Sequence, residues 1–176
     1  MAANRGERQA GALRDRLYLA RLLLEQLEGG GYGPASRASG LALRNGVLLH
    51  LHTALAGLLR KVARDYGGMD AGQLPLGLSE ALDAFSPALT RVPEARLLHA
   101  ALQDPADPVC WLEQQMRWLC EPEPLSRRPR PTEDELRVTL EDPAEPLGEG
   151  DMEALRRCVA RVDELAEQIL TQAAEW

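Results

Sequence analysis

Leucine and alanine recur at alternating steps of three and four residues over three long stretches of the sequence. In the first stretch, about residues 4–28, the recurring positions are Leu13, Leu17, Ala20, Leu24 and Leu27. Because such steps return to one face of an α-helix, each stretch predicts an amphipathic helix. Leucine and alanine favour helices, and the β-branched residues that favour sheets are scarce. The pattern therefore predicts an all-α fold.

The second stretch runs from Ser36 or Ser39, either of which can cap a helix, to about Tyr66. Its broad apolar face consists of Leu41, Leu48, Leu51, Leu55, Leu58, Leu59 and Val62. A face this broad predicts a central helix that is contacted from more than one side. Gly46 and Gly57 interrupt the helix, and each costs up to about 1 kcal/mol relative to alanine. We therefore expect a neighbouring helix to approach closely at both glycines.

The third stretch predicts a last helix that begins at Asp151, whose carboxylate suits an N-cap. Its apolar positions alternate in steps of four and three residues, as in a heptad repeat. Such a seam packs either against helices of its own chain or against the same helix of a second copy. The candidate interaction seam for a protein partner or homodimer consists of Leu155, Val159, Val162, Ile169 and Trp176.

Three shorter helices are predicted between the long ones, over about residues 79–85, 93–103 and 107–120. Ser79 suits a cap, and Pro93 and Pro108 suit the first turn of a helix because a proline there forfeits no hydrogen bond. The segment 121–150 contains six prolines and many charges, which excludes a continuous helix. We expect a compact bundle of about five or six helices in one domain, residues 1–176. The first, second and last helices form its frame, two short middle helices cap it, and 121–150 is an irregular excursion.

The charge of the chain is uneven. The formal net charge is −7, with ten basic and five acidic residues in 1–66 but seven and fifteen in 121–176. This acidity argues against general binding of nucleic acid or anionic membranes, although it leaves a basic face on the N-terminal half open. With no signal peptide core and no membrane span in the sequence, we expect a cytoplasmic protein. Its three cysteines, without CxxC spacing, are expected to be reduced and buried.

The candidate catalytic residues are Arg44, Asn45 and His50 in LRNGVLLHLH. Arginine, a polar residue and a following histidine resemble the active-site motif of HEPN ribonucleases, helical proteins in which arginine and histidine from two paired subunits act on RNA. The resemblance implies that Arg44 stabilises charge and that His50 moves a proton without a metal. In a regular helix, however, six residues place the two side chains about 240° apart. A metal-independent ribonuclease is therefore the alternative function.

Other catalytic and cofactor signatures are missing from the sequence. His50 and His52 are two residues apart, so their rings diverge by about 200° on a helix and cannot share a metal. Nucleotide-binding and serine-hydrolase motifs do not occur. We therefore expect no cofactor and no metal. The leading interpretation is a non-enzymatic protein-interaction or assembly module.

Four segments follow one another along the chain: RLYLARLLLEQLE at 16–28, LHLHTALAGLLRKVARDYG at 49–67, WLEQQMRWL at 111–119 and the closing AEW. This order resembles a family of gammaproteobacterial proteins known as domain of unknown function 6586. The resemblance implies a small helical cytosolic protein without an assigned activity, and it transfers no functional residue to this chain.

Overall fold

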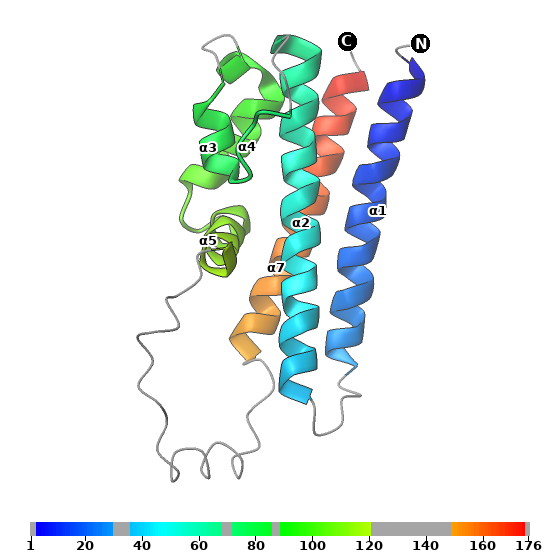
Figure 1. The fold of residues 1–176 in the computed structure, drawn as a ribbon, viewed down its shortest axis with the longest axis vertical. Coiled ribbons are helices and arrows are strands. Elements are labelled where there is room, and N and C mark those ends of the chain that lie inside the picture. Colours follow the sequence, from blue (N-terminus) through cyan, green and yellow to red (C-terminus); the bar gives the residue numbers. More distant parts are fainter. Residues whose placement is uncertain (1–2, 30–35, 68–71, 86–88, 121–148, 175–176) are drawn as a thin grey trace.

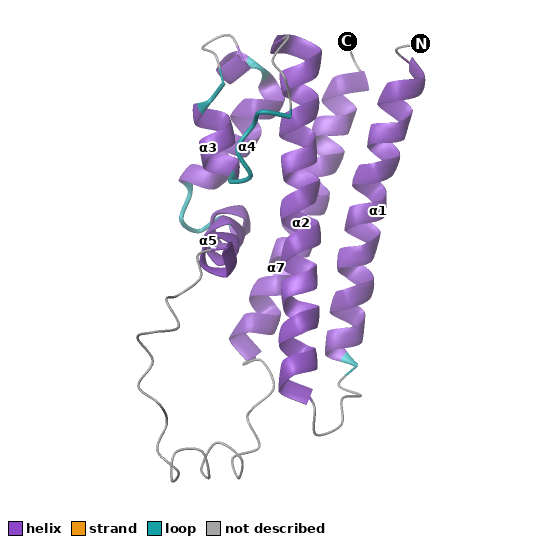
Figure 2. Ribbon diagram, in the orientation of Figure 1, coloured by secondary structure: helices purple, strands orange, loops and turns teal. Residues whose placement is uncertain are grey.

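Three long helices run side by side in the computed structural model, which describes residues 3–29, 36–67, 72–85, 89–120 and 149–174. They are α1 (Ala3–Glu28), α2 (Ser36–Gly67) and α7 (Glu149–Ala174). In Figure 1, α1 runs antiparallel to both α2 and α7, and the two chain ends lie at the same end of the bundle. Figure 2 shows helices and loops alone in the described part of the chain. The predicted all-α bundle and its three long helices are confirmed.

The shorter helices lie along the flank of α2 that faces away from α1 (Figure 1). They are α3 (Leu78–Asp83), the 3₁₀ helix η1 (Leu89–Arg91), α4 (Pro93–Gln103) and α5 (Pro108–Cys120). Pro93 opens α4 as the sequence predicts, and the Asp107 carboxylate accepts a hydrogen bond from the amide of Val109 at the start of α5, at 2.9 Å. The short helices therefore cover a side of the frame and do not close one of its ends.

One continuous cluster of buried side chains joins all of these helices. Leu48, Leu51, Leu55 and Leu59 of α2 are almost completely buried, because the helix has neighbours on several sides. Burying a leucine fully contributes about 1.5–3 kcal/mol, so this helix supplies a large share of the hydrophobic stabilisation. The prediction that α2 lies at the centre of the fold is confirmed.

Two predicted boundaries near the last helix are wrong. Helix α7 begins at Glu149, so Asp151 lies inside its first turn and does not cap it. The predicted irregular segment 121–150 consequently ends before Glu149. Residues 121–148, which make up nearly all of that segment, lie outside the described part of the chain.

Burial also differs from expectation at several side chains. Cys158 is buried, but Cys110 is half-buried and Cys120 is exposed. Trp111 packs against the core, whereas Trp118, two helical turns further along α5, is 63% exposed. Leu119, between Trp118 and Cys120 in the last turn of α5, still packs against the core, so this turn is covered on one side only. Sequence periodicity gives the apolar face of a helix but does not show how much of that face its neighbours cover.

The two glycines of α2 have opposite surroundings. A Cβ atom on Gly46 would lie 2.9 Å from Cδ1 of Leu23 on α1, so the helices approach closely there, as predicted. A Cβ atom on Gly57 would meet no atom within 4 Å. The prediction of a close helix approach at Gly57 is therefore wrong, and this glycine borders open space.

Replacing each glycine by alanine should affect stability differently, because the surroundings of the two positions differ. Gly57→Ala should stabilise the protein by about 0.5–1 kcal/mol, because alanine favours a helix and its methyl group meets nothing. Gly46→Ala should give less than this gain, because Leu23 has to move. The measurement is urea-induced unfolding of both variants followed by circular dichroism. Equal gains at both positions would contradict the close contact at Gly46.

Candidate interaction groove

The arginine and histidine of the catalytic motif reach different helices. Arg44 Nη2 donates a hydrogen bond to Oε1 of Gln115 on α5 at 2.7 Å. His50 accepts one at Nδ1 from Arg16 Nη1 on α1, with the two nitrogens 3.2 Å apart, since arginine can only donate. The structure does not bring Arg44 and His50 together within the chain, as their spacing on a regular helix dictates.

Arg44 is a buried link between α2, α5 and α7. Its guanidinium carbon lies 6.0 Å from the ring centroid of Trp111, and its Nη2 is 3.9 Å from Oδ1 of Asp151. Its Nε, like Oδ1 of the adjacent Asn45, is buried without a hydrogen-bond partner among the described residues. A charge held this far from water and against an aromatic ring joins helices and is not presented to a substrate.

His50 holds Arg16 beside the junction of α1 and α2. Partial burial lowers the pKa of His50, and the positive charge of Arg16 lowers it further. The imidazole is therefore neutral at neutral pH, and its Nδ1 can accept the hydrogen bond from Arg16.

Above this pair, α1, α2 and α7 enclose a pocket of about 200 Å³, here called the socket. Its apolar lining consists of Ala12, Leu13, Ala54, Gly57, Leu58 and Leu170. Leu13, Ala54 and Leu58 are buried and form the floor, whereas Gly57 is exposed at the wall. The missing side chain of Gly57 keeps the socket open.

Three cationic side chains surround the socket: Arg16, Lys61 and Arg64. Lys61 pairs with Asp65 one turn further along α2, at 2.5 Å. Arg64 makes no ion pair with any residue that the structure describes. The basic rim, meaning these three residues, therefore carries positive charge on a protein whose net charge is −7. All three residues belong to the N-terminal part of the chain, where the excess of basic residues allowed a basic face.

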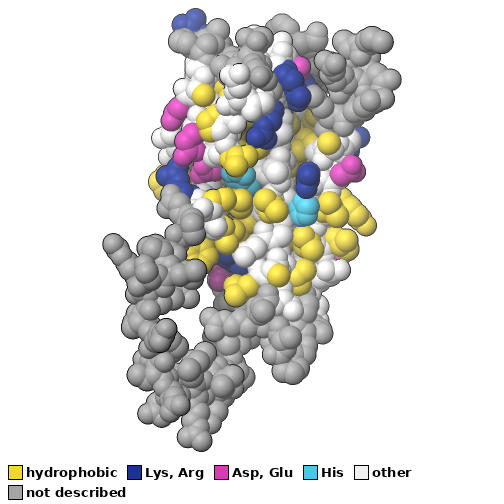
Figure 3. All heavy atoms as spheres, in the orientation of Figure 1, with side chains coloured by type: hydrophobic (Ala, Val, Ile, Leu, Met, Phe, Trp, Pro, Cys, Tyr) yellow, Lys and Arg dark blue, Asp and Glu magenta, His cyan; other side chains and the backbone are white. Residues whose placement is uncertain are grey.

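Apolar side chains continue from the socket along the same face. Leu49, next to His50, is 50% exposed, and Leu19, one turn from Arg16, is 37% exposed. Leu22, a further turn along α1, is also exposed. We call these three leucines the apolar patch. Figure 3 shows this face, with dark blue side chains over the upper half of α2. Yellow side chains gather around and below the right-hand one of the two cyan histidines. The socket, the basic rim and the apolar patch together form the α1–α2 groove, which no sequence motif predicts.

The predicted interaction seam of the last helix is buried within its own chain. Leu155 and Val162 are completely buried, and Val159 and Ile169 retain less than a tenth of their exposure. Trp176 lies outside the described residues. The four described members are therefore not available to a partner or a second copy in this structure, and the open apolar surface belongs to α1 and α2.

A buried polar pair fixes the opposite flank of α2. His52 Nε2 lies 3.2 Å from Oε2 of Glu113 on α5, and both side chains are buried. Oε1 of Glu113 accepts the amide of Leu78 at 3.1 Å. Helix α3 begins at Leu78 with no side-chain cap of its own, so Glu113 replaces the cap predicted at Ser79. Sequence reasoning missed this pair because its members are 61 residues apart.

Burial raises the pKa of Glu113, but hydrogen bonds from His52 and from the amides of Leu78 and Ser79, together with the charge of His52, outweigh burial and lower the pKa below its usual value. Glu113 is thus ionised at neutral pH. Its role is structural, because all of these partners belong to the folded core.

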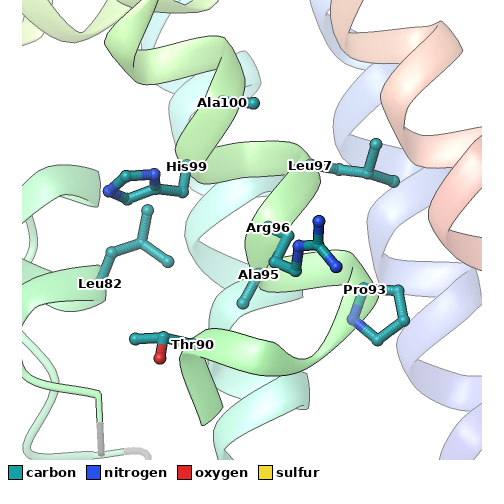
Figure 4. A pocket seen from close by; sticks show the side chains of 8 residues that line it. All are labelled: Leu82, Thr90, Pro93, Ala95, Arg96, Leu97, His99 and Ala100. Atoms are coloured by element: carbon teal, nitrogen blue, oxygen red, sulfur yellow. The ribbon is translucent and has the colours of Figure 1, made fainter. Parts of the chain in front are cut away.

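A larger pocket, of about 600 Å³, lies beside α4. Figure 4 shows the imidazole of His99 beside Leu82, and the guanidinium of Arg96 directed towards Pro93. These two polar side chains point in different directions, and a small-molecule site needs polar groups that converge. No group of three or more His, Cys, Asp or Glu side chains suited to a metal ion occurs among the described residues. None of the described helices has the length and hydropathy of a membrane span.

The structure defines a small all-α protein built on three long helices, with an accessible groove between α1 and α2. Residues 9–176 match the model of a family of unknown function, DUF6586, so the chain belongs to that family. The resemblance found in the sequence is thereby confirmed. No curated protein and no solved structure matches the chain.

The lowered pKa of Glu113 predicts a contribution to stability that depends on pH. Because the folded pKa lies below the unfolded one, the contribution is complete above the unfolded value, about 4.5, and is lost as the pH falls through the folded pKa. Glu113→Gln should lower the free energy of unfolding by about 1–3 kcal/mol at pH 7. The difference from the wild type should shrink in acid.

The measurement is urea unfolding from pH 7 to pH 3. Glu80→Gln is the matched control, because the Glu80 side chain is 52% exposed. A Glu113→Gln variant with the same free energy of unfolding as the wild type at every pH would contradict the stabilising role of the His52–Glu113 pair.

Proposed function

We propose that this protein is a non-enzymatic interaction module that docks a protein partner in the α1–α2 groove. The exposure of Leu19, Leu22 and Leu49 over two adjacent helices, beside an open apolar socket, carries the proposal. Contiguous apolar surface with a polar rim is typical of protein interaction sites. A cytoplasmic location forms part of the proposal, and three unpaired cysteines suit a reducing compartment.

The arrangement of polar groups supports binding more than catalysis. The buried polar groups Arg44, His52 and Glu113 hold helices together and are shielded from solvent. The one histidine at the groove, His50, is engaged by Arg16 and has no carboxylate bonded to it in the described structure. Since Arg44 and His50 reach different helices, the geometry gives the ribonuclease alternative no supporting observation.

A photocrosslinking residue should detect the partner. Benzoylphenylalanine at position 22 should give a discrete adduct of higher mass in cells of the source organism. The same residue at position 76 is the control, because Leu76 is 76% exposed but lies outside the groove. The Leu49→Glu change should reduce the adduct at position 22 at least about tenfold, as for loss of a central interface residue.

Leu49 is half exposed, so its replacement should leave the helical circular dichroism signal and the melting temperature nearly unchanged. Equal yields of adduct at positions 22 and 76 would refute docking at this groove. So would a yield at position 22 that the Leu49→Glu change does not reduce.

A further inference from the structure

We infer that the occupant of the α1–α2 groove is an acidic amphipathic helix of a partner protein, which inserts one large apolar side chain into the socket and sets carboxylates against the basic rim. This inference rests on the proposed docking function and specifies the chemistry of the partner. It draws on the size of the socket, on the charge around it and on the spacing of the apolar positions along the groove.

The socket has the size of one side chain. Its volume is about 200 Å³. A dry cavity of about 150 Å³ holds a benzene ring, whereas pockets for drug-sized molecules have about 300–1,000 Å³. A single leucine or phenylalanine therefore fits the socket. Leu13 and Leu58 retain less than a tenth of their exposure, so the floor is recessed behind its rim and is reached only by a group that projects into it.

The charge at the socket selects an acidic partner. Arg16, Lys61 and Arg64 all line the socket, and Asp65, paired with Lys61, is the one carboxylate bonded to any of them in the described part of the chain. Arginine has five donors, so Arg16 can bind a carboxylate while it still donates to His50. A partner with acidic side chains beside its apolar stripe gains charge pairing here, and a basic partner is repelled.

The spacing of apolar positions along the groove matches a helix. Gly57 at the socket and Leu49 of the apolar patch are eight residues apart on α2, which is about 12 Å along the axis. Ala12 and Leu19, on the α1 side, are seven residues apart, or about 10.5 Å. A partner helix presents the same face again after seven residues, also about 10.5 Å. Apolar residues at positions i and i+7 of such a helix therefore contact the socket and the apolar patch together.

A membrane surface and a fatty acid fit these features less well. A flat bilayer cannot reach the recessed floor, and the negative net charge of the whole chain repels anionic lipids. A fatty acid can fill the socket, but with its single carboxylate either Arg16 or Arg64 lacks a carboxylate partner. A helix engages the socket, the rim and the patch at once.

Selection of helical peptides on the full-length protein tests the inference. The probe is a phage-displayed library of 18-residue helical peptides with random residues on one face and its flanks. Selected peptides should carry leucine or phenylalanine at i and i+7 and be enriched in glutamate and aspartate. Their affinity, measured by fluorescence anisotropy, should fall with increasing salt, since the rim is exposed to solvent.

Two groove variants and one matched control make the test specific. Gly57→Leu should fill the socket and weaken peptide binding at least about tenfold, and a Cβ atom there meets nothing that would disturb the fold. Lys61→Glu with Arg64→Glu should weaken it comparably. Arg91→Glu with Arg96→Glu makes the same charge change around η1 and α4, on the flank of α2 that faces away from α1 (Figure 1), and should leave binding unchanged.

Selection of neutral or basic peptides, no selection at all, or equal binding by wild type and both groove variants would overturn the inference. So would binding of phosphatidylglycerol vesicles or oleate that depends on Lys61 and Arg64 when no peptide is selected. If position 22 still crosslinks in a Leu49-dependent manner, docking at the groove stands and only the acidic helix is rejected. If crosslinking also fails, the docking function itself is rejected.

Discussion

Burial of α2 on nearly all sides is the constraint on which the rest of the structure depends. Leu48, Leu51, Leu55 and Leu59 have almost no exposed surface, so α1, α7 and the short helices all have to pack around this one helix. Packing on several sides leaves little of α2 accessible to solvent. The stripe that remains, between α1 and the short helices, contains Gly57, Lys61 and Arg64 and forms one wall of the groove.

Polar groups within this packing determine where the short helices lie. The buried carboxylate of Glu113 needs hydrogen-bond partners, and these are His52 on α2 and the first amide of α3. Arg44 likewise reaches Gln115 and the ring of Trp111. Because an unpaired buried charge costs several kcal/mol, these contacts hold α5 against α2 in one register. With α5 held there and α1 packed along another side, the exposed stripe of α2 lies between the short helices and α1.

The groove results from a difference between two glycines that are alike in the sequence. At Gly46 the absent side chain admits Leu23 and closes the contact between α1 and α2. Eleven residues on, at Gly57, no neighbour enters, and an apolar socket remains. At Gly46, close packing against Leu23 offsets the destabilising effect of a glycine in a helix. At Gly57, no contact among the described residues offsets it, which suits a role in binding.

The all-α fold, the three long helices and the central place of α2 could be predicted from the amino-acid sequence, because helical periodicity and helix propensity are local properties of the chain. The sequence also showed that Arg44 and His50 diverge, which follows from the geometry of one helix. Three features could not be predicted without the packing of the helices. The described seam residues of α7 are buried, Glu113 accepts the first amide of α3, and Gly57 lines a socket together with Arg16, Lys61 and Arg64. Each of these depends on which helix lies opposite, and residues such as His52 and Glu113, 61 positions apart, meet only when the whole core has packed.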